Sequence, residues 1–515
     1  MRTIYITGVP ERVHPSLRRI ADLFFETTDI VTTKEEADLH LDVVEDDRLT
    51  VCVATSDNRW ERWIHLENSD DPQEWKRKVN DVFLQILEEM TGMKQPWGIL
   101  TGIRPTKLFH TGLRQGQSPD EIETNLQKQY RIHSEKTALM NQITERQLAA
   151  LPDLYELRKE VSIYIGIPYC PTKCAYCTFP AYAIRRKSGQ VNGFLLALEE
   201  EMETIGAWLV QNNIKVTTIY FGGGTPTSIT AEEMDRLYAH MYKTIPGVSS
   251  VRELTVEAGR PDTITPEKID VLKKWNIDRI SINPQSYTQE TLKAIGRHHT
   301  VEETIEKYWL AKSMGLDNIN MDLILGLPGE TTKELKHSLD ETEKLMPASL
   351  TVHTLSFKRA SKMTKQRDKY QVATRDEIGR MMQMAQEWMA ERSYLPYYVY
   401  RQKNILGNLE NTGYSKKGAE SLYNIMIMEE RQTIIGIGCG AASKFVHPQT
   451  GKIERFANPK DPASYLMTHK EAIAKKIHLL NQTFSIDPHT NEQHEMGEQN
   501  ESHSSRKVAG VSAKE

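Results

Sequence analysis

The stretch Ser162-Ile-Tyr-Ile-Gly-Ile-Pro-Tyr-Cys170-Pro-Thr-Lys-Cys174-Ala-Tyr-Cys177 decides how this chain is interpreted. Its apolar first half is typical of a buried β-strand, and its second half carries three cysteines spaced C-x3-C-x2-C. Three thiolates can hold three irons of a cubane [4Fe–4S] cluster, whereas a closed electron-transfer cluster uses four cysteines. The fourth iron is then left open, and an open metal position is what catalysis requires.

Other uses of these cysteines fit the sequence less well. A disulfide framework needs an even number of cysteines in a short secreted chain, whereas this chain has 515 residues and only Cys52 and Cys439 besides the triplet. A zinc site would need a fourth ligand that only a distant residue could supply. Three unrelated core thiols are the remaining alternative. The number and spacing of the ligands favour the iron–sulfur cluster.

Composition and charge narrow the class of protein. With 39% hydrophobic and 26% charged residues, the chain resembles an ordinary soluble globular protein. Its net charge of −5 gives no global basic field, so we expect no nucleic-acid partner. No run approaches eighteen apolar residues and the N-terminal apolar run is short and interrupted, so we expect neither a membrane span nor a signal peptide. Free thiols and a reducible cluster fit the cytoplasm.

The hydrophobic pattern divides the chain into four parts. Residues 1–150 read as an N-terminal α+β extension of unknown role, and residues 155–360 alternate between strand and helix. Residues 361–480 are expected to form a mostly helical C-terminal region, and residues 481–515 a disordered polar tail. The alternating part predicts parallel β/α units of an α/β fold. Its six strand candidates are residues 162–168, 217–223, 253–259, 279–286, 318–328 and 349–357.

Polar and glycine residues stand where several of these strands end. In parallel β/α folds the catalytic groups lie at the carboxyl ends of the strands. Gly222-Gly-Gly224 would let a ligand approach and hydrogen-bond the backbone, because no Cβ intervenes. Glu257 ends the third strand candidate. Gln285 ends the fourth, with Arg297 on the helix and turn that follow, and Asp322 lies inside the fifth. The alternative role for Glu257 is to pair with a structural arginine, and the alternative for Arg297 is a solvated position at a helix end. An acid in a strand as apolar as that of Asp322 must be paired or functional.

These motifs together resemble the oxygen-independent coproporphyrinogen III oxidase (coproporphyrinogen dehydrogenase) family of radical S-adenosylmethionine (SAM) proteins. The resemblance covers roughly residues 160–445, and the extension with Gly98-Ile-Leu-Thr-Gly-Ile-Arg-Pro-Thr-Lys107 is similar to the HemZ-like branch. It implies a partial (β/α)6 radical SAM barrel. It also implies cluster ligands at Cys170, Cys174 and Cys177, and SAM contacts at Tyr164, Tyr176, Gly223, Gly224, Thr225, Glu257, Gln285, Arg297, Asp322, Ser356 and Ala442, of which Tyr164 and Asp322 are also expected to be catalytic.

The same resemblance implies an activity. Coproporphyrinogen III would lose two propionate carboxyl groups as carbon dioxide and become protoporphyrinogen IX, as in porphyrin and haem biosynthesis. The partners expected are the tetrapyrrole substrate and a reduced electron donor such as flavodoxin or ferredoxin. The candidate cations for the substrate carboxylates are Arg185-Arg-Lys187, Lys358-Arg359, Arg401 and Lys444.

Two positions keep a second function open. Dehydrogenases of the family usually carry a further cysteine two residues after the triplet, where this chain has Phe179 and the related haem chaperones have phenylalanine. Those chaperones carry a His-Asn-x-x-Tyr-Trp signature, where this chain reads Leu422-Tyr-Asn-Ile-Met-Ile-Met428. The alternative is therefore a haem-binding chaperone that does not decarboxylate. An RNA-modifying enzyme is disfavoured, because Cys52 and Cys439 cannot hold a second cluster by themselves.

Overall fold

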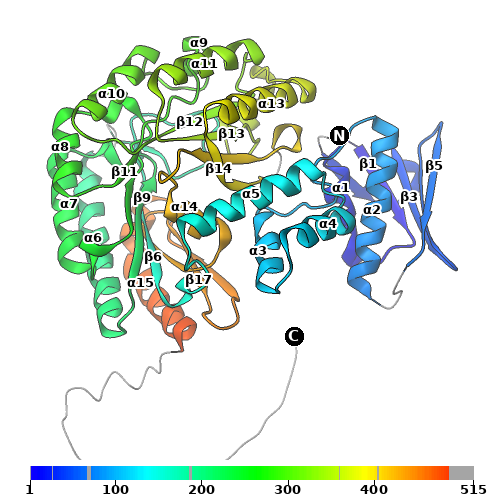
Figure 1. Ribbon diagram of the computed structural model, residues 1–515, viewed down its shortest axis with the longest axis horizontal. Helices are drawn as coiled ribbons and strands as arrows, with labels where there is room; N and C mark the ends of the chain where they lie inside the picture. The colour runs from blue at the N-terminus through cyan, green and yellow to red at the C-terminus, as the bar shows by residue number, and fades with distance from the viewer. Residues whose placement is uncertain are drawn as a thin grey trace, which may run out of the picture.

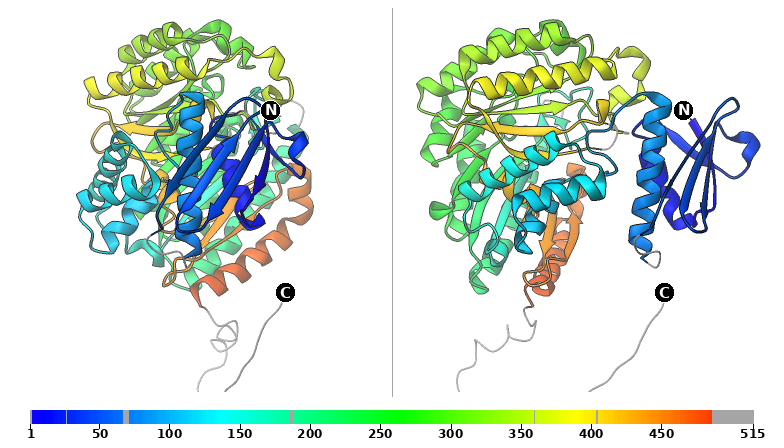
Figure 2. Two further views of the ribbon diagram at one scale, coloured as in Figure 1. Left: turned by 90° about the vertical axis from the view of Figure 1, so that its right-hand side faces the viewer. Right: turned by 45° about the vertical axis from the view of Figure 1, so that its right-hand side comes forward.

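Two large sheets organise the molecule (Figure 1). A third sheet has two short strands, β7 (Tyr169–Cys170) and β8 (Tyr182–Ala183). The computed structural model describes residues 2–25, 27–66, 71–184, 188–358, 360–402 and 405–485. Within these ranges, no helix is long and apolar enough to cross a membrane. The larger sheet lies at the centre of a layer of helices, and the smaller one stands apart at the N-terminal end of the chain (Figure 2).

Six parallel strands form the barrel that the sequence predicts, and this prediction is confirmed. They follow one another in the sheet in chain order, and the aliphatic residues of these strands form one core with the surrounding helices. The strands are β6 (Val161–Ile167), β9 (Val216–Gly223), β10 (Glu253–Val256), β11 (Arg279–Ser281), β12 (Ile319–Leu325) and β13 (Ser349–Thr354).

Helices on the outside connect these strands and hold their ends in line. Capping boxes at Thr230 and Thr331 start two of them, and the Thr300 side chain caps a third through the amide of Glu303. The helices are α6 (Ser188–Gln211), α7 (Ala231–Thr244), α8 (Pro266–Lys274), α9 (Gln289–Ala294), α10 (Val301–Ser313) and α11 (Thr332–Leu345).

The C-terminal region is not only helical, and here the prediction was incomplete. Its helices are α12 (Lys362–Lys365), α13 (Arg375–Glu391), α14 (Leu422–Glu429) and α15 (Pro462–Phe484). Five strands accompany them: β14 (Leu395–Tyr400), β15 (Asn411–Ser415), β16 (Thr433–Gly438), β17 (Ala442–Val446) and β18 (Ile453–Ala457). The reason is that six strands alone would leave two unpaired edges. β15 pairs with β13 and β16 pairs with β6, which extends the sheet to eleven strands.

The end of the described chain bears on the expected tail. Helix α15 continues to Phe484, past the boundary expected at residue 481. The rest of the expected tail, from residue 486 onward, lies outside the described residues.

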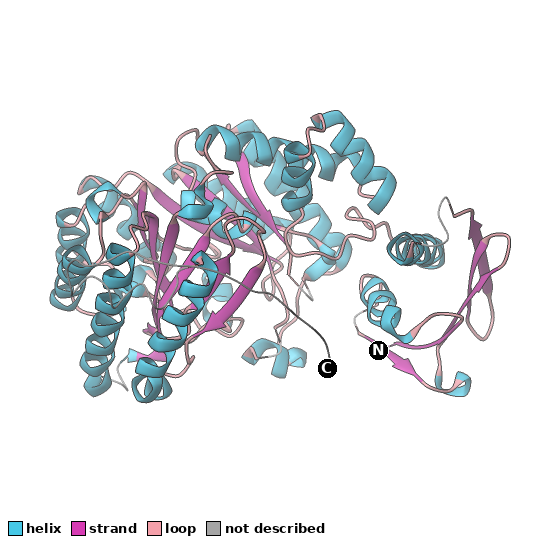
Figure 3. Ribbon diagram, turned by 90° about the horizontal axis from the view of Figure 1, so that it is seen from below, coloured by secondary structure: helices cyan, strands magenta, loops and turns pink. Residues whose placement is uncertain are grey.

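The N-terminal extension consists of two pieces. The first has a five-stranded sheet, in the order β2-β1-β3-β4-β5, with two helices on one face (Figure 3) and a core of its own. The second piece is three helices that lie between that sheet and the barrel (Figure 2). The elements are β1 (Arg2–Thr7), α1 (His14–Ala21), β2 (Thr28–Val31), β3 (Leu39–Glu45), β4 (Leu49–Ala54), β5 (Arg59–Ile64) and α2 (Pro72–Thr91), followed by α3 (Thr106–Arg114), α4 (Pro119–Tyr130) and α5 (Ser134–Ala150).

Candidate active site

A cavity of about 500 Å³ opens at the carboxyl ends of the parallel strands. Loops that follow different strands meet there, as expected for parallel β/α folds. Every residue that the sequence analysis placed at the cluster or at SAM lines this one cavity. They are Tyr164, Cys170, Cys174, Tyr176, Cys177, Gly223, Gly224, Thr225, Glu257, Gln285, Arg297, Asp322, Ser356 and Ala442.

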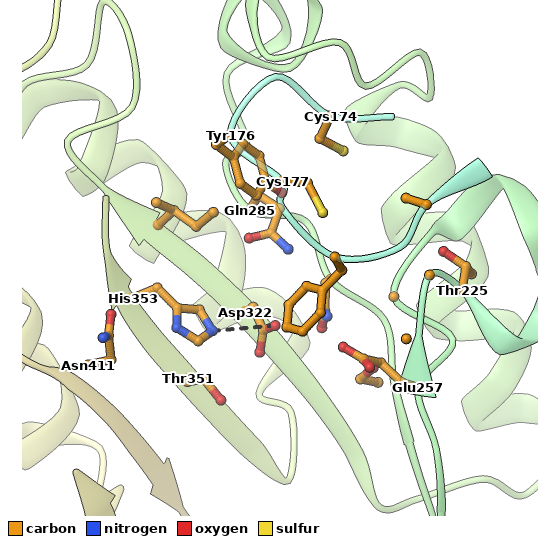
Figure 4. A pocket seen from close by; sticks show the side chains of 18 of the residues that line it. Cys174, Tyr176, Cys177, Thr225, Glu257, Gln285, Asp322, Thr351, His353 and Asn411 are labelled. Carbon is orange, nitrogen blue, oxygen red and sulfur yellow. Dashed lines mark ion pairs between the residues drawn. The ribbon is translucent and has the colours of Figure 1, made fainter. Parts of the chain in front are cut away.

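The cysteines lie on the loop between β6 and α6. Backbone bonds at Ala175 fix this loop: its amide donates to the Ile295 carbonyl at 2.8 Å, and its carbonyl accepts from the Met363 amide at 2.9 Å. Cys170 is buried, with its sulfur 3.3 Å from Thr225 Oγ1, while Cys174 and Cys177 are half-buried. The loop thus presents its thiols to the cavity from a fixed backbone (Figure 4).

Three thiols are the number that a cubane cluster with one open iron takes, each on a different iron. Among the described residues, no group of three or more His, Cys, Asp or Glu side chains is placed to hold one metal ion. Burial raises the pKa of Cys170 to about 12, so this thiol is neutral until a metal displaces its proton.

The three glycines bring the end of β9 against the cysteine loop. A Cβ on Gly224 would lie 2.5 Å from the Tyr169 carbonyl oxygen, so no other residue fits there. The amide of Gly224 donates to the Ile167 carbonyl and that of Thr225 to the Tyr169 carbonyl, both at 2.7 Å. These two amides are therefore already bonded within the fold. If backbone groups of this segment bind SAM, as the sequence predicts, they are groups other than these two amides.

Glu257 faces the cavity from the end of β10. A Cβ on Gly222 would lie 3.0 Å from Glu257 Oε2, so the absence of a side chain at Gly222 makes room for the carboxylate. Burial raises the pKa of Glu257 to about 8, the charge of Asp322 adds to the shift, and Arg279 and Arg297 oppose it. In the described part of the chain, Arg279 and Arg297 act on Glu257 through their charge and not through a hydrogen bond, which disfavours the structural alternative.

Gln285 and Arg297 are held by the backbone around them. Gln285 has φ 67°, a left-handed conformation that costs a non-glycine residue energy, and bonds through its backbone to β12. Its buried Oε1 has no protein partner. Arg297 is buried rather than solvated, and donates to the carbonyls of Asn283 at 2.6 Å and Gly259 at 3.2 Å. The backbone of Gln285 and the side chain of Arg297 are thus fixed at the wall of the cavity.

Asp322 belongs to a chain of polar groups that crosses the cavity wall. Asn320 Nδ2 donates to Asp322 Oδ1 at 2.8 Å, and His353 Nε2 lies 3.6 Å from Asp322 Oδ2 (Figure 4). The other ring nitrogen of His353 lies 3.3 Å from the Tyr400 hydroxyl of β14. Burial alone would raise the pKa of Asp322, but His353, Asn320 and Arg279 hold it below the usual value. Asp322 is therefore an anion in a polar setting.

Sequence reasoning missed several side chains of the cavity. Two are rings stacked next to the predicted Tyr164: the centroid of Tyr220 lies 6.0 Å from that of Tyr164, and Tyr423 of α14 packs against Tyr220 at 4.6 Å. Another is Arg279, which is buried in β11 and donates to Ser349 Oγ at 3.1 Å. A charged residue inside a short parallel strand was a signal that could have identified Arg279.

The candidate cations for a carboxylate substrate separate into three groups. Lys358 lines the cavity as expected. Arg401 and Lys444 do not line it: Arg401 is buried against the Leu100 carbonyl and Asn408, and Lys444 pairs with Glu430. The candidates Arg185-Arg-Lys187 and Arg359 lie outside the described residues.

Comparison with known proteins shows similarity to one family model and to several characterised relatives. Residues 164–342 match the family model described as the radical SAM superfamily. The chain is 58% identical over 492 residues to "Oxygen-independent coproporphyrinogen-III oxidase-like protein HemZ" of Bacillus subtilis (strain 168), covering 93% of this chain and 98% of the relative. It is 32% identical over 280 residues to "Heme chaperone HemW" of the same organism, covering 54% of this chain and 70% of the relative.

A solved structure is also similar in outline. It is the coproporphyrinogen III oxidase HemN from Escherichia coli, titled a radical SAM enzyme, which is 19% identical. The alignment covers 66% of this chain and 73% of that one, with a TM-score of 0.49.

Proposed function

This chain belongs to the HemZ-like branch of the oxygen-independent coproporphyrinogen III oxidase family of radical SAM proteins, and from that premise we propose that it oxidatively decarboxylates coproporphyrinogen III to protoporphyrinogen IX. The observation that carries the proposal is the convergence of the three cysteines with Glu257, Gln285, Arg297 and Asp322 on one cavity. We place the reaction in the cytoplasm, where the three thiols stay reduced.

The cofactor chemistry is general to the superfamily, and the residues present fit it. When bound, the cluster and SAM supply a 5′-deoxyadenosyl radical after transfer of one electron. Cys170, Cys174 and Cys177 would hold the cluster. Glu257 offers its carboxyl group and Asp322 its ionised carboxylate to the amino and hydroxyl groups of SAM, and the charge-assisted bonds of Asp322 fix orientation as well as affinity.

The substrate side of the cavity is suited to a carboxylate. The guanidinium of Arg279 and the ammonium of Lys358 line it, and the rings of Tyr220 and Tyr423 offer flat apolar faces for a pyrrole. For each propionate, one hydrogen atom leaves the β-carbon to the radical, the carboxyl carbon leaves as carbon dioxide, and one electron passes to an acceptor. A vinyl group remains, and the electrons balance.

The alternative is a haem chaperone, as one relative is named. In the described chain, α14 presents Tyr423, Asn424, Ile427 and Met428 to the cavity, none of which is a histidine. His353 lines the cavity, but its ring nitrogens lie beside Asp322 and Tyr400. Binding of a haem iron by His353 would draw one of these nitrogens away from its neighbour, and this favours the enzyme.

Anaerobic reconstitution followed by mass spectrometry tests the proposal. With a reductant, SAM and coproporphyrinogen III, we expect 5′-deoxyadenosine and a product that has lost two carboxyl groups. Haem titration followed by absorbance is the second arm. Stoichiometric haem retention with no vinyl product would establish the chaperone instead.

A further inference from the structure

Three arginines from different parts of the chain gather around the ring of Tyr155. Arg114 belongs to the last turn of α3, Arg158 to the short turn Leu157–Lys159 before β6, and Arg431 to the link between α14 and β16. The guanidinium carbon of Arg114 lies 5.9 Å from the centre of the Tyr155 ring, and that of Arg431 lies 5.4 Å from it. Burial lowers the pKa of Arg431, and the charges of Arg114 and Arg158 lower it further. The three cations therefore form one arginine cluster.

The arginine cluster lies at the opposite end of the barrel from the cysteine loop. Thr433, the first residue of β16, pairs with Val161, the first residue of β6, so Arg158 and Arg431 stand at the amino ends of two neighbouring strands. The cysteines follow the carboxyl end of β6, a strand of 7 residues that spans about 20 Å. Residues of α14 line the cavity, whereas the three arginines do not, so the cluster is separate from the candidate active site.

Arg431 is buried without a hydrogen-bond acceptor for its Nε. The residue is 6% exposed, and within the described part of the chain its Nε has no partner. Buried donors in folded proteins are almost always bonded to protein, water or a ligand. Arg114 and Arg158 are further cations that repel Arg431 and cannot accept its hydrogen bonds. An anion between the three guanidinium groups would supply the missing acceptor and offset this repulsion.

The carboxylates of the surrounding segments are engaged elsewhere or face solvent. Asp153 pairs with Arg252, and Glu430 pairs with Lys107 and three further cations. Glu160 accepts from Thr217 Oγ1 at 2.7 Å, and Glu156 is exposed. Glu429 raises the pKa of Arg431 through its charge, but its Oε1 already accepts bonds from Thr106 and Gln147. These are the carboxylates of residues 106–117, 151–160, 429–432 and 446–452, all of which are described.

The arginine cluster is both held in place and open to solvent. The turn between β17 and β18 packs against Arg158: its Nη1 donates to the Pro448 carbonyl at 3.4 Å, and a Cβ on Gly451 would lie 2.8 Å from its Nη2. Arg431 is buried, Arg158 is half-buried and Arg114 is exposed, so a ligand can enter from the side of Arg114. Guanidinium groups fixed in this way match the oxygens of a phosphate group through paired hydrogen bonds.

We propose that Arg114, Arg158 and Arg431 bind a phosphate group at this end of the barrel. A doubly charged phosphate has enough oxygens to accept from all three side chains, including the Nε of Arg431. The group is either free inorganic phosphate or the phosphate of a monoester such as a nucleoside monophosphate. Because the site involves neither the cluster nor SAM, the inference does not depend on the proposed decarboxylation. The bound group would join α3 and the turn before β6 to the segment that follows α14.

Titration calorimetry of the full-length protein tests the site. With inorganic phosphate as titrant, at an ionic strength held constant with chloride, we expect one saturable equivalent. In the variant Arg114→Gln with Arg158→Gln the affinity should fall at least about tenfold, because two of three guanidinium groups are lost. Neither side chain is buried, so the fold should be retained. Arg114→Gln alone changes an exposed residue and should weaken binding about threefold or more. Titration with AMP separates the two sources, since a monoester site binds AMP more tightly than phosphate.

A matched control and the location of the ion complete the test. Arg12 and Arg19 are exposed arginines of the N-terminal piece, and Arg12→Gln with Arg19→Gln removes the same charge far from the cluster. This variant should bind phosphate as the wild type does. Hydrogen exchange measured by mass spectrometry locates the ion, because a bound ligand slows local opening. Phosphate should slow exchange in residues 151–160 and 429–435 and leave the cysteine loop unchanged.

Three outcomes would overturn the inference. One is the absence of saturable binding in the wild type up to about 10 mM phosphate, which corresponds to a negligible affinity. Another is an equal loss of affinity in the two double variants, which would reflect net charge alone. The last is slowed exchange in the cysteine loop but not in residues 151–160 and 429–435, which would place the phosphate in the cavity. Failure of the proposed function is a different result, because it concerns the vinyl product and not phosphate binding.

Discussion

Glu257 combines a raised pKa with a place at the cavity wall, and this makes stability depend on pH. Its pKa of about 8 in the folded protein lies above the ordinary value of 4.5. The folded state therefore holds the proton more tightly, and the stability gained below about pH 4.5 is lost as the pH rises through 8. We expect the wild-type protein to lose about 1–3 kcal/mol between pH 6 and 9 relative to Glu257→Gln.

Denaturation of the cluster-free protein at several pH values measures this difference. The comparison with Glu257→Gln cancels the titration of all other groups, and Glu303→Gln on the surface of α10 serves as a control that should follow the wild type. If the free energy of unfolding changed with pH in the same way for the wild type and Glu257→Gln, the carboxyl group of Glu257 would be ionised at neutral pH.

Asp322 remains charged beside His353 and Asn320, so the variant Asp322→Asn changes its charge and little else. The amide keeps the shape but removes the charge from a hydrogen bond to SAM. We expect cluster assembly to be normal and SAM affinity to fall roughly 10- to 100-fold, since charge-assisted bonds contribute about 1.5–3 kcal/mol. Equilibrium binding of SAM to the reconstituted protein is the measurement, and normal affinity would remove Asp322 from the SAM site.

The sequence could predict these residues because each belongs to or follows a strand of recognisable pattern. Glu257 follows β10, Asp322 is an acid inside the apolar strand β12, and the cysteines carry their own spacing. Tyr423 was not predictable in the same way, since α14 reaches the cavity only through the complete tertiary arrangement. A tyrosine on a short helix far from the cysteines carries no local signal of which wall it will line.

At the scale of elements, the last turn of α14 is anchored by the N-terminal extension. Glu430 follows α14 and lies within ion-pair distance of Lys107 at 2.6 Å, Arg455 at 2.9 Å, Arg104 at 3.0 Å and Lys444 at 3.3 Å. Two of these cations belong to the run 98–107, whose chemistry the sequence left unassigned. This run thus positions the helix that lines the cavity.

We expect Glu430→Gln to destabilise the protein by about 3 kcal/mol at neutral pH, because several cations lose their only shared carboxylate. Burial alone would raise the pKa of Glu430, but Lys107, Lys444 and Arg104 hold it at about 2, below the ordinary 4.5. The contribution is therefore complete above about pH 4.5 and is lost as the pH falls through 2. Urea denaturation at pH 7 and pH 3 measures both effects.

The control for this variant is Glu454→Gln, an exposed carboxylate on β18 next to Arg455. It should cost less than about 0.5 kcal/mol, as surface charges usually do. An equal loss in both variants would mean that the anchor of α14 contributes nothing specific.

As with the residues, some elements could be predicted from the sequence and others could not. The six parallel strands and the helix of residues 375–391 have long, regular patterns that the sequence displays directly. The strands β14 to β18 are short, and they form because the two edge strands of the barrel need hydrogen-bonding partners. That need arises from the assembled sheet and not from any local stretch of sequence.

For the molecule as a whole, the N-terminal sheet and the barrel have separate cores. In the described part of the chain, polar contacts that join the sheet module to residues beyond it lie at Leu23, Asp81, Glu88 and Met93. Arg375 Nη1 and Gln95 Nε2 donate to the Leu23 carbonyl, and Arg131 pairs with Asp81 of α2. The Gln95 amide and the Lys94 ammonium lie against the Glu88 carboxylate, and Arg375 Nη1 lies 3.4 Å from Met93 Sδ. Residues 95–151 are in turn bound to the barrel, as Trp97 Nε1 donates to buried Glu410 and Thr106 Oγ1 to buried Glu429. We therefore propose that the extension itself consists of two parts, which meet near residue 93.

Two truncations test that division. A chain that starts at Lys94 loses the five-stranded sheet with α1 and α2 but keeps every contact to Glu410 and Glu429, so we expect SAM cleavage within about twofold of the full-length protein. A chain that starts at Pro152 leaves both buried carboxylates without their partners, which costs several kcal/mol, and we expect it to be insoluble or inactive. The amount of 5′-deoxyadenosine formed is compared between the chains. Calorimetry of the chain that starts at Lys94 should show that only the unfolding transition of the sheet module has disappeared. Loss of SAM cleavage in the chain that starts at Lys94 would mean that the barrel depends on the sheet module, contrary to the proposed division.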